Sequence, residues 1–111
     1  MLFRSLSILT RKPELTHAEF KEVWLGDHAP MVRAIPEVKK YVLSFVANVS
    51  TKAYVPIHDV QIDAIDELWY EDNAALARAA ARPEMAEILK NGAKYLAGIK
   101  TVITEEVEII K

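Results

Sequence analysis

The sequence contains no cysteine, only 3 glycines among 111 residues, and no surplus of basic side chains. The absence of cysteine excludes disulfides, thiolate nucleophiles and sulfur-ligated metal sites. Because so little glycine is present, there is no Gly-rich phosphate loop, and a nucleotide cofactor is not expected. A net charge of −2 does not provide the positive surface that nucleic-acid binding requires, so nucleic acid is not an expected partner.

Long apolar runs are missing as well. No stretch approaches the roughly 20 residues that a membrane-spanning helix needs. The opening run to Leu9 is interrupted by Arg4 and two serines and has no basic lead-in, so we expect a strand and not a signal peptide. His17, His28 and His58 lack the short spacing that places two metal ligands on one side. The sequence therefore predicts a cytoplasmic protein without membrane contact, metal or cofactor.

Apolar residues make up 51% of the chain, which is enough for one domain with its own core over residues 1–111. Apolar periodicity and breaks at proline, glycine and capping residues divide the chain into six elements. The expected strands span residues 2–9, 38–49, 62–70 and 101–110, and two helical regions span 16–36 and 72–92, the second stopping at Gly92. This order is the ferredoxin-like βαββαβ pattern, an α+β fold whose antiparallel four-stranded sheet carries its helices on one face.

Local signals mark the first helical region. Thr16 stands three residues before Glu19, which is the spacing of a capping box at a helix N-terminus. Pro30 removes a backbone amide and crowds the carbonyl of Gly26. The helix is therefore expected either to kink there or to stop and restart with Asp27 as the new cap.

Both faces of the expected strands carry apolar residues, yet two helical regions cover only one face of a four-stranded sheet. The simplest cover for the other face is a second copy of the chain, packed sheet against sheet. We therefore predict a homodimer through the exposed sheet face. The alternative is a monomer whose second face is wet.

A titratable side chain continues a row of aromatic rings on the first helix. Phe20, Trp24 and His28 are four residues apart and so lie on one helix face. An unperturbed imidazole titrates near pH ~6.5, which makes His28 the best candidate for a general acid or base. The alternative is a core histidine bonded to the backbone. Trp24 is expected to form a wall, either of a pocket or of the core.

Other candidates lie on the strands and in the loop between them. A phenol at Tyr41 could donate to a developing oxyanion, or it could simply pack in the core. Asp66 and Glu67 point to opposite faces of their strand, so one carboxylate is either a buried base with a raised pKa or part of an ion pair at the rim. His58 lies in a loop that could close a pocket or remain solvated.

An ordered set of motifs runs through nearly the whole chain. Its first half comprises residues 6–9, 12–13, Phe20, Trp24, 28–30, Pro36 and Tyr41. With these motifs the chain resembles the EthD family, which belongs to the dimeric α+β barrel group. The later half is similar to the bacterial methylmuconolactone methylisomerases at residues 55–56, 59–60, 62–65, Glu67, Trp69, Gly92, 94–95 and 102–107.

The resemblance implies a small cofactor-independent enzyme of aromatic or lactone catabolism that binds its substrate between sheet and helices. In those isomerases a histidine and a tyrosine that match His28 and Tyr41 line the pocket together with a cysteine. The position of that cysteine is Leu68 here, so chemistry that needs a thiol is excluded. The expected substrate-binding residues are Trp24, Leu68, Trp69, Glu67 and His58.

These observations leave three classes of function open. The first is an isomerase-type or lyase-type enzyme that transfers a proton on a small cyclic, aromatic or lactone-like molecule, with His28 as general acid or base and Tyr41 polarising a substrate oxygen. The second is a non-catalytic accessory protein that presents a hydrophobic small molecule or haem to another enzyme. The third is a purely structural dimer without a cavity beside His28.

Overall fold

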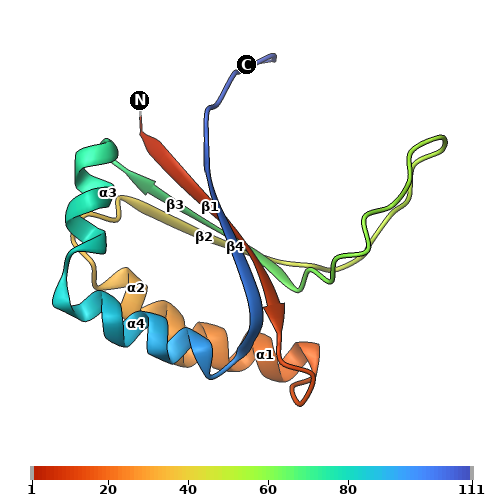
Figure 1. The fold of residues 1–111 in the computed structure, drawn as a ribbon, viewed down its shortest axis with the longest axis horizontal. Coiled ribbons are helices and arrows are strands. Elements are labelled where there is room, and N and C mark those ends of the chain that lie inside the picture. Colours follow the sequence, from red (N-terminus) through yellow and green to blue (C-terminus); the bar gives the residue numbers. More distant parts are fainter. Residues whose placement is uncertain (1, 111) are drawn as a thin grey trace.

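The computed structural model describes residues 2–110, which form a four-stranded antiparallel sheet with helices against one face (Figure 1). The strands lie in the order β2-β3-β1-β4 and span β1 (Phe3–Arg11), β2 (Lys40–Phe45), β3 (Ala64–Tyr70) and β4 (Leu96–Thr104). The helical segments are α1 (His17–Val23), the π-helical η1 (Trp24–His28), α2 (Ala29–Arg33), α3 (Asn73–Ala80) and α4 (Pro83–Ala93). The predicted ferredoxin-like architecture is confirmed. Within these residues no helix combines the length and the apolar character needed to cross a bilayer.

The first helical region begins as predicted, and near Pro30 it does not stop and restart. The Thr16 hydroxyl accepts from the Glu19 amide at 3.1 Å, and the Glu19 carboxylate accepts from the Thr16 amide at 2.9 Å, which completes the capping box. No new cap forms at Asp27. Instead the helix widens into one π-helical turn, Trp24–His28, and then continues into α2 with Pro30 in its first turn. This wide turn carries His28.

Two element boundaries near the C-terminus differ from the prediction. The last strand is Leu96–Thr104, several residues earlier than the expected 101–110, because its pairing with β1 already ends where Thr104 faces Arg4. Gly92 does not stop α4 but lies inside it. A Cβ at this position would stand 3.3 Å from Cε1 of His28, so the glycine allows α4 to pack closely against η1.

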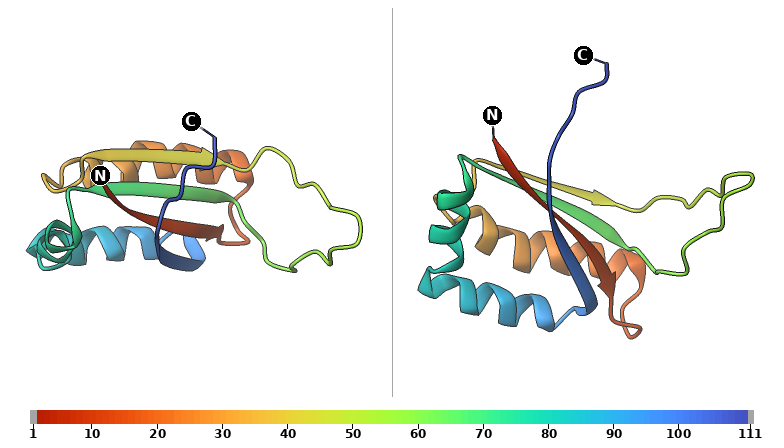
Figure 2. Two further views of the ribbon diagram at one scale, coloured as in Figure 1. Left: turned by 90° about the horizontal axis from the view of Figure 1, so that it is seen from above. Right: turned by 45° about the horizontal axis from the view of Figure 1, so that its top comes forward.

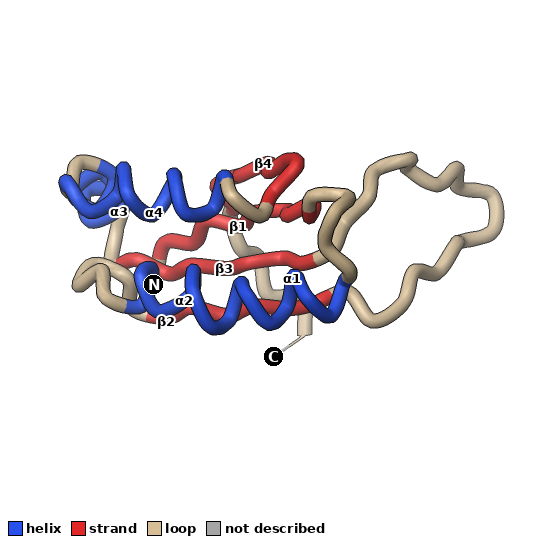
Figure 3. The backbone as a smooth tube through the Cα atoms, turned by 90° about the horizontal axis from the view of Figure 1, so that it is seen from below, coloured by secondary structure: helices blue, strands red, loops and turns tan. Residues whose placement is uncertain are grey.

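The core lies between the sheet and the helices. Figure 3, seen from below, shows α1–α2 and α4 running beside each other across one face of the sheet. One buried cluster gathers where α2, α3 and α4 meet β3, and a second where α1 and η1 meet β1 and β3. The first contains Val32, Ile35, Tyr70, Ala75, Ala79 and Ile88, and the second Leu9, Phe20, Trp24 and Ala64.

The connection between β2 and β3 is a long arm, residues 46–63, that projects away from the domain (Figures 1 and 2). Strand β2 is consequently shorter than the predicted 38–49. Asp63 holds the base of the arm, since its amide donates to Leu9 O and its carbonyl accepts from the Val46 amide, both at 2.9 Å. The arm raises the radius of gyration to 15.2 Å, above the roughly 13 Å of a compact domain of this length. Its exposed apolar residues are Val49, Tyr54, Val55, Ile57 and Val60.

Candidate active site

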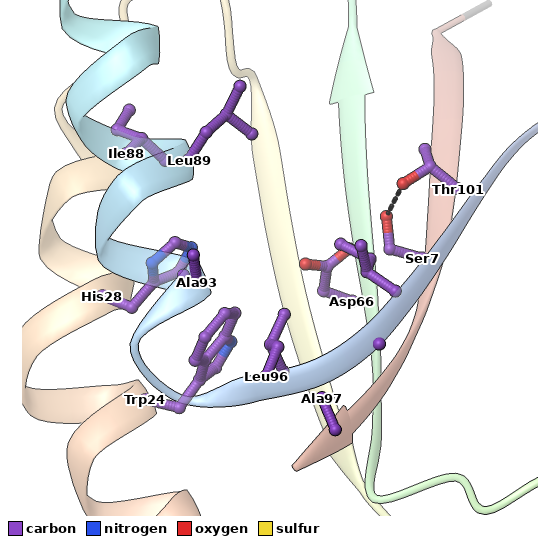
Figure 4. Close-up of a pocket in the computed structure, with 13 residues that line it drawn as sticks. Ser7, Trp24, His28, Asp66, Ile88, Leu89, Ala93, Leu96, Ala97 and Thr101 are labelled. Atoms are coloured by element: carbon purple, nitrogen blue, oxygen red, sulfur yellow. Dashed lines mark hydrogen bonds between the residues drawn. The ribbon is translucent and has the colours of Figure 1, made fainter. Parts of the chain in front are cut away.

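A cavity of about 400 Å³ opens between the helices and the sheet (Figure 4). This volume falls in the range of small-molecule sites. Side chains from η1 and α4 form one wall, and β1, β3 and β4 form the other. The lining residues are Ser7, Trp24, His28, Asp66, Ile88, Leu89, Gly92, Ala93, Leu96, Ala97, Gly98, Ile99 and Thr101.

His28 lies in the helical wall of this cavity and is held on two sides. Its ring stacks on Trp24 with the centroids 3.8 Å apart and the planes inclined by 19°. Its Nδ1 lies 2.9 Å from Oδ1 of Asn91 on α4. The side chain is buried, yet it borders the cavity.

A chain of hydrogen bonds determines which nitrogen of His28 carries the proton. Asn91 donates from Nδ2 to Oδ2 of Asp27 at 2.9 Å, and the Tyr95 hydroxyl donates to the same oxygen. This arrangement turns Oδ1 of Asn91 towards the imidazole. Because an amide oxygen only accepts, Nδ1 of His28 must be the donor, and in the neutral ring Nε2 keeps its lone pair. Nε2 has no hydrogen-bond partner among residues 2–110.

The electrostatics favour that neutral ring. Burial lowers the pKa of His28, and the hydrogen bond to Asn91 and the charge of Asp27 oppose this only in part. The pKa of Asp27 is itself lowered, chiefly by the hydrogen bond from Tyr95 and then by that from Asn91, so Asp27 remains an acceptor. At neutral pH the site therefore presents an unprotonated imidazole nitrogen, which is the form of a general base.

Asp66 borders the cavity from the sheet. It is buried, and its Oδ1 has no hydrogen-bond partner in the described part of the chain. Burial raises its pKa to about 6, although hydrogen bonds to Ser7 act in the opposite direction. On the neighbouring strands the hydroxyls of Ser7 and Thr101 lie 2.7 Å apart. Figure 4 shows these three side chains on the sheet wall, facing the helices.

Comparison with known proteins identifies the family of this chain. Residues 12–98 match the EthD domain, which is most of the chain. The chain belongs to the EthD family. It is 26% identical over 106 residues, 95% of this chain and 98% of the relative, to a Pseudomonas reinekei protein named 4-carboxymethyl-4-methylbutenolide mutase.

Solved structures share the fold of this EthD chain. An EthD family protein from Bacillus halodurans superposes with a TM-score of 0.74 at 22% identity, over 96% of this chain and 100% of that one. A dimeric ferredoxin-like protein of unknown function from Thermobifida fusca superposes with a TM-score of 0.70 at 16% identity, over 94% of this chain and 90% of that one. Identities this low show the fold alone.

Tyr41 and Leu68 lie near the site of the EthD domain but do not line its cavity. Both pack against the first core cluster. The Tyr41 hydroxyl is buried and makes no hydrogen bond of good geometry within residues 2–110, although Trp24 lies close enough to lower the pKa of the phenol in part. Burial, and then the charge of Asp66, raise the pKa of this phenol, which therefore stays protonated at neutral pH.

Glu67, Trp69 and His58 lie away from the cavity. Side chains alternate along a strand, so Glu67 and Trp69 point to the open face of the sheet while Asp66 points to the helices. There Glu67 pairs with Arg4 at 2.7 Å, and the Arg4 guanidinium lies over the Trp69 ring. His58 is exposed on the arm. In a single chain, the structure thus brings Trp24 together with His28 at the cavity but not these three residues.

Two polar features of the site were not singled out from the sequence. Asn91 follows His28 by 63 positions, and nothing in the local pattern of α4 distinguishes it from a surface amide. The pair of Ser7 and Thr101 depends on the register of β1 and β4. Strand parity left Asp66 and Glu67 as alternatives for the inward carboxylate, and the orientation of the sheet selects Asp66. Within residues 2–110 no cluster of His, Asp or Glu has the arrangement of a metal site.

Proposed function

We propose that this EthD protein is a cofactor-independent enzyme that transfers a proton on a small cyclic, aromatic or lactone-like molecule, as an isomerase or lyase does. The observation that carries the proposal is the chain from Asp27 through Asn91 to His28, because it leaves Nε2 as a free base in a ring that borders the cavity. The named activity of the Pseudomonas reinekei relative, a mutase of a butenolide, supports the same reaction class.

In this proposal His28 both takes and returns the proton. A neutral imidazole removes a proton from a carbon beside a carbonyl group, and the imidazolium formed returns it to another carbon of the same molecule. The stacked Trp24 ring holds the imidazole plane in place. Tyr41, the candidate from the sequence for polarising the substrate oxygen, keeps a protonated hydroxyl but does not line the cavity, so it would have to act from behind the sheet wall.

The test compares wild type with His28→Asn and His28→Ala in a screen of lactones and phenolic catabolites. Loss of a general base is expected to reduce kcat by about 10²–10⁴-fold. A shared far-UV circular dichroism spectrum would show that the variants are folded. Equal turnover by wild type and both variants would remove His28 from the mechanism.

A binding role without catalysis is the second candidate. Nδ1 of His28 is hydrogen-bonded to Asn91, which leaves Nε2 free. A free Nε2 is also the atom through which a histidine coordinates a haem iron or binds another ligand. Titration with haemin distinguishes the two functions. A Soret band that shifts on binding and is lost in His28→Ala would favour haem presentation, and a featureless titration would argue against it.

We further propose that the protein is a cytoplasmic homodimer joined through the open face of the sheet. One row across this face consists of Val42, Glu67, Leu6 and Val102, so apolar side chains flank a single charge that is already paired with Arg4. A related fold from Thermobifida fusca is described as dimeric. The exposed apolar side chains of the arm would also find cover on a second copy.

Light scattering after size exclusion tests the dimer. Wild type is expected at twice the chain mass, and Leu6→Asp, in the middle of the open face, at the mass of one chain. Ala86→Asp, on the exposed surface of α4, is the control and should remain dimeric. A wild-type protein that runs as a monomer at micromolar concentration would contradict the proposal.

A further inference from the structure

The wall of the cavity opposite His28 contains a polar group without a partner. Asp66 is 7% exposed, and its Oδ1 has no hydrogen-bond partner within residues 2–110. A buried polar atom that stays unpaired costs free energy, typically about 1–3 kcal/mol, so such an atom calls for an explanation. Figure 4 shows the carboxyl group directed from β3 towards the helices, across the space that His28 borders.

The remaining lining restricts what this carboxyl group can meet. Between His28 and Asp66 the surface of the cavity is apolar, and Ile88, Leu96 and Ile99 are among its side chains. Neither lysine nor arginine is among the described lining residues. A carboxylate on a bound molecule would therefore enter an apolar space without a counter-charge and close to the carboxyl of Asp66, which is unfavourable.

Tyr41, the other candidate for contact with a substrate oxygen, lies behind Asp66 as seen from the cavity. Tyr41 on β2 faces Leu68 on β3. Asp66 precedes Leu68 on the same face of β3. Asp66 lines the cavity and Tyr41 does not. A substrate oxygen in the cavity thus meets the carboxyl before the phenol.

We propose that Asp66 is the second proton-transfer group of this site and that the site accepts neutral lactones or cyclic ketones and rejects those that bear a carboxylate. The proposal rests on the function proposed above and adds the substrate class and the acid. It also separates this chain from its Pseudomonas reinekei relative, whose name specifies a carboxymethyl group on the butenolide.

The proposed step conserves atoms and electrons. Nε2 of His28 takes a proton from the carbon next to the carbonyl, and the electron pair of that C–H bond forms a C=C bond. The carbonyl π electrons move to oxygen, which takes the proton of the Asp66 carboxyl and becomes an enol. In the return step Asp66 recovers its proton from the enol oxygen while the imidazolium protonates a different carbon. The product is a double-bond isomer, and both residues regain their initial states.

Other groups face Asp66 and influence its titration. On the helix-facing side they are the hydroxyls of Ser7 and Thr101, the phenols of Tyr41 and Tyr70, and His28 across the cavity. The charge of Glu67, on the opposite face of β3, also raises the pKa of Asp66. With burial as the main cause, the pKa of Asp66 rises to about 6, and that of His28 falls. The rate should therefore rise as His28 loses its proton and fall as Asp66 loses its own above about pH 6.

The test uses α-angelica lactone, a neutral butenolide whose double bond moves into conjugation by this step, and muconolactone, a butenolide that carries a carboxymethyl group. Proton NMR in D₂O measures turnover and deuterium uptake. Wild type is expected to convert the neutral lactone with a kcat/KM at least about 100-fold above that for muconolactone. Failure to convert it, or a preference for muconolactone, would overturn the substrate class.

Variants separate this inference from the function on which it rests. Asp66→Asn should lower kcat for α-angelica lactone by about 10²-fold or more and remove the fall in rate above pH 6. Above about pH 6, where the wild-type carboxyl is charged, it should also improve inhibition by muconolactone, since the repelling charge is gone. Glu71→Gln, which removes an exposed carboxylate just after β3, is the matched control. If Tyr41→Phe loses activity and Asp66→Asn does not, the phenol is the donor and Asp66 is excluded. If only His28→Asn is inactive, the general base stands without Asp66.

Discussion

Arg4 and Glu67 on the open face of the sheet are paired with each other, whereas two polar atoms on the face towards the helices are buried without a partner among residues 2–110. On the open face Arg4 pairs with Glu67 at 2.7 Å and donates to Thr104, and Arg4 and Lys40 both lie over the Trp69 ring. On the other face the Asp66 Oδ1 and Tyr41 Oη atoms are buried without partners in the described residues. Paired groups stabilise or organise a surface, whereas unpaired buried groups cost stability and are retained where they serve a ligand.

The largest effect should come from neutralising the buried carboxylate. The folded-state pKa of Asp66, about 6, lies above the ordinary value of 3.8, so the native state binds more protons and loses stability as the pH rises from about 4 to about 6. Relative to wild type, Asp66→Asn should therefore gain on the order of 3 kcal/mol at pH 8 and almost nothing at pH 4. Urea unfolding at both pH values measures the gain, and an equal change at both would contradict the pKa assignment.

The next largest effect is expected at Asn91. Replacing it with leucine removes the acceptor for Nδ1 of His28 and a donor to Asp27, so the ring loses the bond that selects its tautomer. Turnover of an active lactone should fall about 10–100-fold, by analogy with the partners that orient metal-ligating histidines. Lys90→Leu, on the exposed side of the same helix, is the control. Unchanged kcat in Asn91→Leu would show that the hydrogen-bond chain has no part in the reaction.

A smaller effect is expected from closing the contact between α4 and His28. Alanine in place of glycine inside a helix usually adds about 0.5–1 kcal/mol of stability. At Gly92 the added Cβ would lie 3.3 Å from Cε1 of His28, a ring that Trp24 and Asn91 already hold. Gly92→Ala should therefore show little or none of that gain, together with a few-fold lower kcat. Thermal unfolding and kinetics check both effects, and a full gain with normal turnover would mean that the ring is free to move.

The smallest effect belongs to the open face. Glu67→Gln breaks an ion pair with Arg4 whose side chains are 21% and 22% exposed, and ion pairs near a protein surface contribute roughly 0–1 kcal/mol. At a protein concentration low enough to dissociate the proposed dimer, the expected loss in urea unfolding is below about 1 kcal/mol and should shrink further in high salt. A loss as large as the change expected for Asp66→Asn would remove the contrast between the two faces.

Features set by a few neighbouring residues could be predicted from the sequence, whereas features set by pairing across the fold could not. The capping box of Thr16 and the stripe that ends in His28 are local patterns, and both form as expected. The last strand was misplaced because the apolar residues Val107, Ile109 and Ile110 suit a strand by propensity, but they lie beyond the end of β1 and have no partner strand.

In the candidate site, too, local features could be predicted from the sequence and long-range contacts could not. Strand parity already limited the inward carboxylate to Asp66 or Glu67, and the sheet orientation decided between them. The chain from Asp27 to Asn91 joins residues 64 positions apart, so no local pattern could reveal it. The tautomer of His28 follows from that chain and was therefore beyond prediction from the sequence.

The protonation of His28 can be measured without knowing the substrate. Two-dimensional ¹H–¹⁵N NMR of the imidazole, recorded across pH 4–8, reports the tautomer and the pKa together. We predict a proton on Nδ1, an unprotonated Nε2 at pH 7, and a pKa below the ordinary 6.5. A ring with its proton on Nε2, or one that is mostly imidazolium at pH 7, would contradict the proposed general base.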